Sequence, residues 1–169
     1  MGTRLVSAFA GGIFLLLAAA ATAAPIGVGD AFPVLASVNL AGAPLPETAG
    51  KVVLVDFWAS WCAPCKASFP AYGRINSDFA SKGLVIVAVS VDQDQAAYDN
   101  FVKKLAPGFF VAFDRDQSLV RRVEVPTMPT SYLLDRQGRV RFIHPGYHGA
   151  ETEALIRREV ETLLAEKAS

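Results

Sequence analysis

The chain has 169 residues, of which 52% are hydrophobic, and its 16 basic and 16 acidic residues give a formal net charge of zero. This length suits one domain with a sizeable hydrophobic core. A balanced charge provides no general attraction to polyanions, so we expect no binding to nucleic acid.

The first 23 residues carry the pattern of a secretory signal peptide. Arg4 precedes an uncharged stretch from Leu5 to Ala24 that is rich in Leu, Phe and Ala, and Ala21-Thr22-Ala23 fits the small-x-small rule for cleavage. Cleavage there would leave residues 24–169 as the mature domain. The alternative is an uncleaved membrane anchor, because about 20 apolar residues suffice to span a bilayer.

The next part of the chain predicts an extension and then a buried strand. Apolar alternation over Phe32–Leu40 and turn residues over Ala41–Pro44 predict an N-terminal hairpin or extension. The run Val52–Phe57 is mostly β-branched or aromatic, which is typical of a strand in the middle of a parallel sheet. Asp56 interrupts this run, and a carboxylate in such a strand needs a reason.

A helix over about Ala63–Phe79 should follow, with Gly83 as its C-cap and Pro70 as a kink inside it. Five of its residues lie near one face at helical spacing: Phe69, Tyr72, Ile75, Asn76 and Phe79. A second buried strand is predicted over Leu84–Val91.

A further helix over Asp94–Leu105 and a strand over Phe109–Phe113 come next, separated by Pro107-Gly108. The apolar stripe of this helix indicates packing against the core and not a cofactor site. It consists of Tyr98, Phe101, Val102 and Leu105.

The remaining elements are a short helix over Asp116–Val123, a strand over Ser131–Asp135, a return strand over Arg139–Ile143 and a last helix over Glu151–Lys167. Acidic residues open the last helix, and Lys167 lies near its end, as the helix dipole prefers. Its predicted buried stripe is Leu155, Ile156, Val160, Leu163 and Leu164. The order β-α-β-α-β-α-β-β-α predicts an α/β fold with a mixed sheet and helices on both faces.

The two cysteines of the chain, Cys62 and Cys65, flank Ala63-Pro64. Pro64 suits the first turn of a helix, which places Cys62 at the helix N-terminus, where free N–H groups and the dipole favour a thiolate. A structural disulfide normally closes a longer loop, so this spacing favours a redox couple. We expect Cys62 to be the nucleophile that forms a mixed disulfide and Cys65 to resolve it.

The sequence Trp61-Cys62-Ala63-Pro64-Cys65-Lys66 after such a strand, with Asp56 before it and Pro129-Thr130 farther on, resembles the thioredoxin superfamily. From about Gly29 onward the pattern is similar to the exported TlpA/ResA/DsbE-type branch. The resemblance implies a thioredoxin fold with an N-terminal extension and a central helix–strand insertion. It also implies that the kink at Pro70 is a family feature.

The same resemblance suggests roles near the cysteines. Asp56 matches the buried acid of thioredoxins, which would have a raised pKa and take the proton of Cys65. The alternative is an ordinary strand-edge carboxylate that reaches water. Pro129 matches the family's cis-proline, which with Met128 would face the cysteine pair and dock the substrate backbone; the alternative is an ordinary turn.

Three further residues lie close to the cysteines in the sequence. We expect Trp58 and Trp61 to frame it. Lys66 is expected to be a solvated helix residue and not a catalyst.

The resemblance implies a reductase of protein disulfides in the bacterial periplasm, either secreted or tethered to the inner membrane. Apocytochrome c is one client in that family, and a membrane-embedded thiol reductase is the implied electron donor. We expect a monomer without a cofactor or metal beyond the Cys62–Cys65 couple. The main alternative is an oxidant or isomerase that runs the same residues in the other direction. Ala63 and Pro64 offer neither a side-chain donor nor a charge, which favours the reducing direction.

Three other classes are less consistent with the sequence. A zinc site would need four ligands such as Cys62, Cys65, His144 and His148. The gap between the two pairs is far longer than a zinc finger allows. Both histidines are expected to be ordinary loop residues. A peroxiredoxin-like peroxidase would have threonine where Ala59 stands. A non-enzymatic, chaperone-like binding module would not need both cysteines.

Overall fold

The structure is a computed structural model that describes residues 24–167, so the predicted signal peptide or anchor over residues 1–23 lies outside the described residues. The strands are β1 (Ala41–Gly42), β2 (Val52–Trp58), β3 (Leu84–Ser90), β4 (Phe110–Phe113), β5 (Thr130–Leu134) and β6 (Val140–Pro145). The helices are α1 (Ala63–Phe79), α2 (Gln95–Leu105), α3 (Ser118–Val123) and α4 (Ala150–Ala165), with short 3-10 turns at Leu35–Ser37 and Ala80–Lys82.

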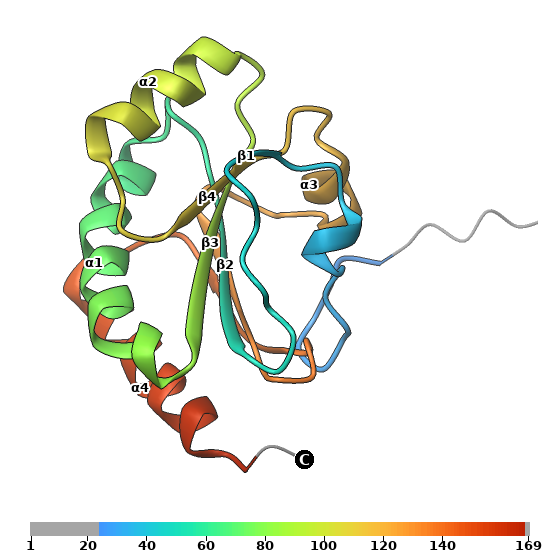
Figure 1. The fold of residues 1–169 in the computed structure, drawn as a ribbon, viewed down its shortest axis with the longest axis vertical. Coiled ribbons are helices and arrows are strands. Elements are labelled where there is room, and N and C mark those ends of the chain that lie inside the picture. The colour runs from blue at the N-terminus through green and yellow to red at the C-terminus, as the bar shows by residue number, and fades with distance from the viewer. Residues whose placement is uncertain (1–23, 168–169) are drawn as a thin grey trace, which may run out of the picture.

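One mixed sheet organises these elements, with the strand order β1-β4-β3-β2-β5-β6. The strands β2, β3 and β4 run parallel, whereas β1, β5 and β6 each run antiparallel to a neighbour. Figure 1 shows α1, α2 and α4 on one side of the sheet and α3 on the other. The α/β fold class and the element order predicted from the sequence are therefore confirmed.

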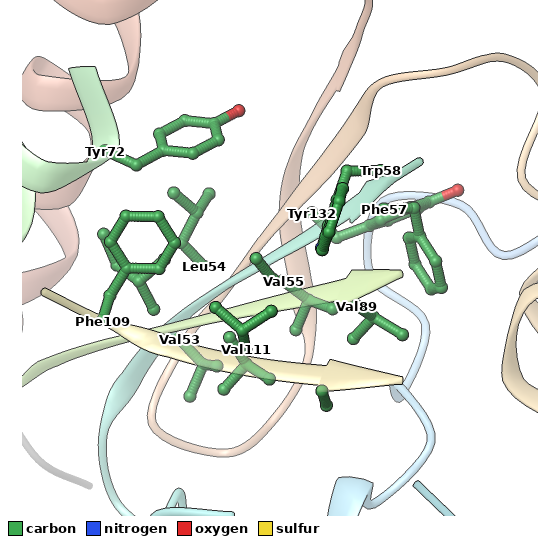
Figure 2. Close-up of a cluster of buried hydrophobic side chains, with 14 of the residues drawn as sticks. Val53, Leu54, Val55, Phe57, Trp58, Tyr72, Val89, Phe109, Val111 and Tyr132 are labelled. Atoms are coloured by element: carbon green, nitrogen blue, oxygen red, sulfur yellow. The ribbon is translucent and has the colours of Figure 1, made fainter. Parts of the chain in front are cut away.

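The central strand β2 is buried along its whole length, as its β-branched and aromatic run predicted. Its two faces differ. Asp56 and Trp58 point toward α1, where they meet Tyr72 and Phe69, while Phe57 packs against Tyr132 on the other face. Figure 2 shows several of these side chains around β2. Because side chains alternate along a strand, Asp56 and Trp58 share one face.

Of the two predictions for the N-terminal segment, a hairpin or an extension, the structure shows the extension. Residues Leu35–Ser37 form a 3-10 turn, and the short strand β1 pairs with β4 at the edge of the sheet. Gly42 makes this pairing possible, because its φ is 112° and a Cβ there would lie 2.8 Å from the Tyr98 hydroxyl oxygen. The segment is thus an extension that adds an edge strand.

Helix α1 begins and ends where the sequence predicted. Cys62 is its N-cap, Pro64 lies in its first turn, and Pro70 lies inside it. The buried residues include Phe69, Tyr72, Ile75 and Phe79. Asn76 is only partly buried, and its amide instead donates to the Gly108 carbonyl at 2.7 Å, which ties α1 to the loop after α2. Gly83, with φ of 106°, ends the 3-10 turn that continues the helix.

The other two long helices bury narrower stripes than predicted. In α2, Tyr98 and Phe101 are buried but Leu105 is exposed, because the chain turns into the left-handed region at Ala106 and the last helical residue faces outward. In α4, Leu155 is exposed as well, while Ile156 and Val160 are buried.

The C-terminal end of α4 is stabilised by an arginine from the β5–β6 turn. Lys167 lies beyond the last helical residue, so its predicted role at the helix end is wrong. Arg136 instead donates to the carbonyls of Leu163 and Leu164 at 2.9 Å and of Glu166 at 2.7 Å. These carbonyls have no partner within the helix, so a guanidinium is well suited to them.

Candidate active site

A disulfide joins Cys62 and Cys65 at the N-terminus of α1, with an S–S distance of 2.02 Å and a Cα–Cα distance of 5.3 Å. The backbone N–H of Cys65 points at the Cys62 sulfur at 3.2 Å. Cys62 keeps 4% of its surface exposed and Cys65 none. The first cysteine therefore receives a helix-end N–H, which would stabilise a thiolate after reduction, and the second is fully enclosed.

The loop that carries Cys62 is held to the end of β3. The Ser60 N–H donates to both oxygens of the Asp92 carboxylate at 3.0 Å, and the Ser60 hydroxyl donates to Oδ1 at 2.9 Å. The Ser90 hydroxyl donates to Oδ2 of the same carboxylate at 2.8 Å. Asp92 is itself buried, so these bonds exchange little with water and fix the approach to the cysteines.

Asp56 is completely buried in the middle of β2, which rules out the alternative of a carboxylate that reaches water. Burial raises the pKa of Asp56 from 3.8 to about 7, although hydrogen bonds from Tyr72 and Ser131 oppose the shift. The Tyr72 hydroxyl donates to Oδ1 at 2.9 Å. Within residues 24–167, Oδ2 is one of two buried side-chain polar atoms without a hydrogen-bond partner.

Trp58 lies in the core beneath the site. It has no exposed surface, and its ring packs against Phe69 at 5.1 Å and Phe101 at 4.3 Å between centroids. The expectation that both tryptophans frame the site is therefore corrected for Trp58, which sits on the α1 side of β2 under two helices. Its indole Nε1 is the second buried polar atom without a partner in the described part of the chain.

Trp61 is by contrast 70% exposed beside the cysteines. A groove of about 530 Å³ starts at this ring and also contains Met128, so the structure brings these two predicted residues together. The groove is lined by Ser60, Trp61, Val91, Asp92, Gln93, Asp94, Ala97, Gln117, Val120 and Met128.

The Met128–Pro129 peptide bond is cis, as the motif predicted. Thr130, the first residue of β5, pairs with Phe57 near the end of β2. Pro129 therefore lies at the end of the sheet where the loop to Cys62 begins. Its carbonyl accepts a hydrogen bond from the Gly146 N–H at 2.7 Å. Met128, unlike Pro129, lines the groove.

Of the two histidines, both predicted to be ordinary loop residues, only His148 lies in a loop. His144 lies in β6, is buried, and pairs with Glu159 of α4 at 2.6 Å. His148 lies in the loop before α4. Among residues 24–167, no group of three or more His, Cys, Asp or Glu side chains is placed to hold a metal ion. The same residues include no helix that is both long and apolar enough to cross a bilayer.

The fold and the disulfide at a helix start define a protein of the thioredoxin type. The thioredoxin-like family profile matches residues 50–140, more than half of the chain, and the chain belongs to this family. Its curated relatives include the thiol-disulfide oxidoreductases ResA of Bacillus subtilis, 35% identical over 112 residues, and of Oceanobacillus iheyensis, 32% identical over 125 residues. These matches cover 66% and 70% of this chain and 61% and 65% of the two relatives. The chain thus spans less than two thirds of their length.

A solved structure from Chlorobium tepidum, provisionally assigned as a thiol:disulfide interchange protein DsbE, has the same fold. It superimposes with a TM-score of 0.73 at 31% sequence identity, covering 83% of this chain and 99% of that one. The superposition therefore supports the thioredoxin fold that the sequence predicted.

Three residues of the site were not singled out from the sequence. Asp92 follows a buried parallel strand, and a carboxylate at the carboxyl end of such a strand is a signal that could have been used. Tyr72 was assigned to an apolar core stripe, and Ser131 to the start of a strand. Neither position carries a local signal for a contact with Asp56, since that contact joins three different elements.

Proposed function

We propose that the chain is a thiol–disulfide oxidoreductase that reduces protein disulfides through its Cys62–Cys65 couple. The observation that carries the proposal is the disulfide between residues three apart at a helix N-terminus, with Cys62 as the N-cap. The ResA and DsbE names of similar proteins support a thiol–disulfide oxidoreductase activity. A buried acid in the adjacent strand supports proton transfer at this couple.

The reaction starts from the reduced protein. The Cys62 thiolate attacks one sulfur of a client disulfide, which breaks the client S–S bond, forms a mixed disulfide and releases the other client sulfur as a thiolate. Cys65 gives its proton to Asp56 and attacks the Cys62 sulfur. The Cys62–Cys65 bond then forms, the bond from Cys62 to the client breaks, and the client sulfur leaves as a thiolate. Two electrons have passed to the client.

The reducing direction is supported by the residues between the cysteines. Ala63 and Pro64 supply no side-chain donor or charge to stabilise a thiolate on Cys62. A couple of this kind should have a potential nearer to that of thioredoxin, about −270 mV, than to that of the strong oxidant DsbA, about −120 mV. Equilibration with glutathione buffers, followed by thiol alkylation, measures this. A potential at the oxidising end would replace the reductase by the oxidant or isomerase alternative.

The cellular setting is also part of the proposal. The signal-peptide pattern of residues 1–23 supports export to a bacterial periplasm, with or without tethering to the inner membrane. There the protein would receive electrons from a membrane-embedded thiol reductase and act, as a monomer, on clients such as apocytochrome c. Trapping of mixed disulfides by a Cys65→Ala variant, followed by mass spectrometry, identifies the clients.

The cysteine roles have a direct test. Iodoacetamide should modify Cys62 and not Cys65 in the reduced native protein near neutral pH. Cys62→Ser should abolish the reduction of insulin disulfides, whereas the matched Cys65→Ser variant should accumulate stable mixed disulfides. Faster alkylation of Cys65 than of Cys62 would reverse the assigned roles.

A further inference from the structure

The two oxygens of the Asp56 carboxylate have different surroundings. Oδ1 accepts a hydrogen bond from the Tyr72 hydroxyl at 2.9 Å, and the Ser131 hydroxyl lies 2.9 Å from the same tyrosine oxygen. Oδ2 is equally buried but has no hydrogen-bond partner among residues 24–167. One oxygen of the carboxylate is therefore fixed by a hydrogen bond, and the other is buried but free to accept one.

Tyr72 connects this carboxylate to the helix that carries the cysteines. Cys65, Ser68 and Tyr72 lie on one buried face of α1, at spacings of three and four residues. Long helical side chains point back toward the helix N-terminus, so the Tyr72 hydroxyl lies over the turn that contains Ser68. Ser68 donates to the Cys65 carbonyl at 2.9 Å and its side chain interacts with Tyr72. Figure 2 shows Tyr72 reaching from α1 with its hydroxyl directed away from the helix.

We propose that Tyr72 is a positioning residue for Asp56: it occupies Oδ1, is itself held by Ser131, and leaves Oδ2 as the oxygen that accepts the proton of Cys65. This inference rests on the proposed function. In the step concerned, the S–H bond of Cys65 breaks, an O–H bond forms at Oδ2, and the resulting thiolate attacks the Cys62 sulfur of the mixed disulfide. The client sulfur leaves with the electron pair of the broken S–S bond.

The hydrogen bond from Tyr72 also influences the pH range in which Asp56 is ionised and can accept a proton. A hydrogen bond donated to a carboxylate stabilises its charged form, so the Tyr72 hydroxyl lowers the pKa of Asp56 and opposes burial, which raises it. Other ionisable groups near this row of the sheet lie on β6, on α4 and in the loop between them, where the Tyr147 ring lies 6.4 Å from that of Tyr72. Ser131 pairs with Asp56 on one side and with His144 on the other, and His144 contacts Glu159. Without the hydroxyl, Asp56 would hold its proton to a higher pH.

The test uses Tyr72→Phe, which removes only the hydroxyl, and dithiobis(nitrobenzoic acid) as the disulfide probe. Attack by Cys62 on this reagent releases one coloured thiolate, and attack by Cys65 on the mixed disulfide releases a second. The rate of the second phase is measured against pH. We expect Tyr72→Phe to move its midpoint upward by about one pH unit and to slow it about tenfold below the midpoint. The first phase should not change.

Two controls separate this role from a structural one. Tyr132→Phe makes the same change on the opposite face of the sheet, away from Asp56, and should leave both phases unchanged. In an Asp56→Asn background, Tyr72→Phe should have no further effect on the second phase. Should Tyr72→Phe fail to fold, Ser131→Ala tests the same contact and should shift the midpoint in the same direction by a smaller amount.

The outcomes distinguish the two proposals. A normal first phase with an unmoved second-phase midpoint in Tyr72→Phe would overturn the role of Tyr72 and leave the proposed function standing. An equal slowing by Tyr72→Phe with and without Asp56 would also overturn it, because the effect would not pass through the carboxylate. Absence of the first phase in the parent protein would overturn the proposed function and this inference together.

Discussion

The backbone N–H of Ser60 donates to both carboxylate oxygens of Asp92 at 3.0 Å, across the gap between the end of β3 and the loop that leads to Cys62. Ser60 follows β2 and Asp92 follows β3, and these parallel neighbours end at the same end of the sheet. This bond therefore fixes the position of the nucleophile's loop with a partly buried, charge-assisted contact.

Replacing Asp92 with alanine should loosen that loop. Asp92→Ala leaves the Ser60 N–H and the Ser60 and Ser90 hydroxyls without their acceptor, which should lower the free energy of unfolding by about 2–3 kcal/mol. It should also slow alkylation of Cys62 in the reduced protein. Urea unfolding and iodoacetamide kinetics measure the two effects. The control is Asp94→Ala, which removes the exposed N-cap of α2 and should cost about 1 kcal/mol without changing Cys62.

The buried acid should make the oxidised protein less stable as the pH rises. Since the pKa of Asp56 is about 7 when folded and 3.8 when exposed, its contribution is fully present below pH 3.8. Between these values the unfolded state loses the proton and the folded state keeps it, so stability falls, by up to about 4 kcal/mol, and the loss is complete above pH 7.

Asp56→Asn should remove this slope and make the protein more stable than its parent above neutral pH. Urea unfolding of the oxidised protein across this range is the measurement. Asp94→Asn, the same change at an exposed helix cap, should leave the slope intact. A parent whose stability does not fall with rising pH would contradict the assigned shift.

The packing of α2 on Trp58 should be a major source of stability. Phe101 is buried, and its ring centroid lies 4.3 Å from that of Trp58 and 5.2 Å from that of Phe69. Phe101→Ala should lower the free energy of unfolding by about 3–5 kcal/mol. Phe110→Ala, at a half-exposed position on β4, should cost much less. Equal losses in denaturant unfolding would show that α2 does not support the core as described.

The edge strand should depend on one glycine. Gly42→Ala forces a side chain into a left-handed backbone and places a Cβ 2.8 Å from the Tyr98 hydroxyl oxygen and 3.3 Å from the Val111 carbonyl oxygen. We expect a loss of about 1–3 kcal/mol. The matched control is Gly108→Ala, because no atom lies within 4 Å of the corresponding Cβ. A thermal melt of the two variants that shows equal stability would argue against the tight pairing of β1 with β4.

Local patterns predicted the parts of this fold that depend on local chemistry. The run Val52–Phe57 and the Pro64 helix start identified β2 and α1 almost to the residue, because strand composition and proline geometry act within a few positions. The sequence left a hairpin and an extension open for the N-terminal segment, because the partner of β1 is β4, far along the chain. The prediction that Leu105 is buried was wrong, because hydrophobic periodicity identifies the apolar face of a helix but not the residue at which the helix ends.

The residues of the candidate site were likewise predictable where a local motif specifies them and not where tertiary packing does. The spacing of Cys62 and Cys65 places both sulfurs at one helix start, so the sequence was sufficient to find them. The position of Trp58 next to the motif did not reveal which face of β2 it occupies, and this face decided its burial. The contact between Tyr72 and Asp56 depends on how α1 lies on the sheet, which no short motif specifies.

The antiparallel pairing of β5 with β2 has a consequence for how the protein matures. Asp56 and the cysteines are synthesised well before Ser131, which covers Asp56 from the neighbouring strand. Until β5 adds to β2, the carboxylate is open to water and ionises as any surface aspartate does. The proton-accepting chemistry of the site thus arises only when the C-terminal part of the chain has docked. A chain in which β5 has not yet docked presents two thiols without the buried acid that serves them.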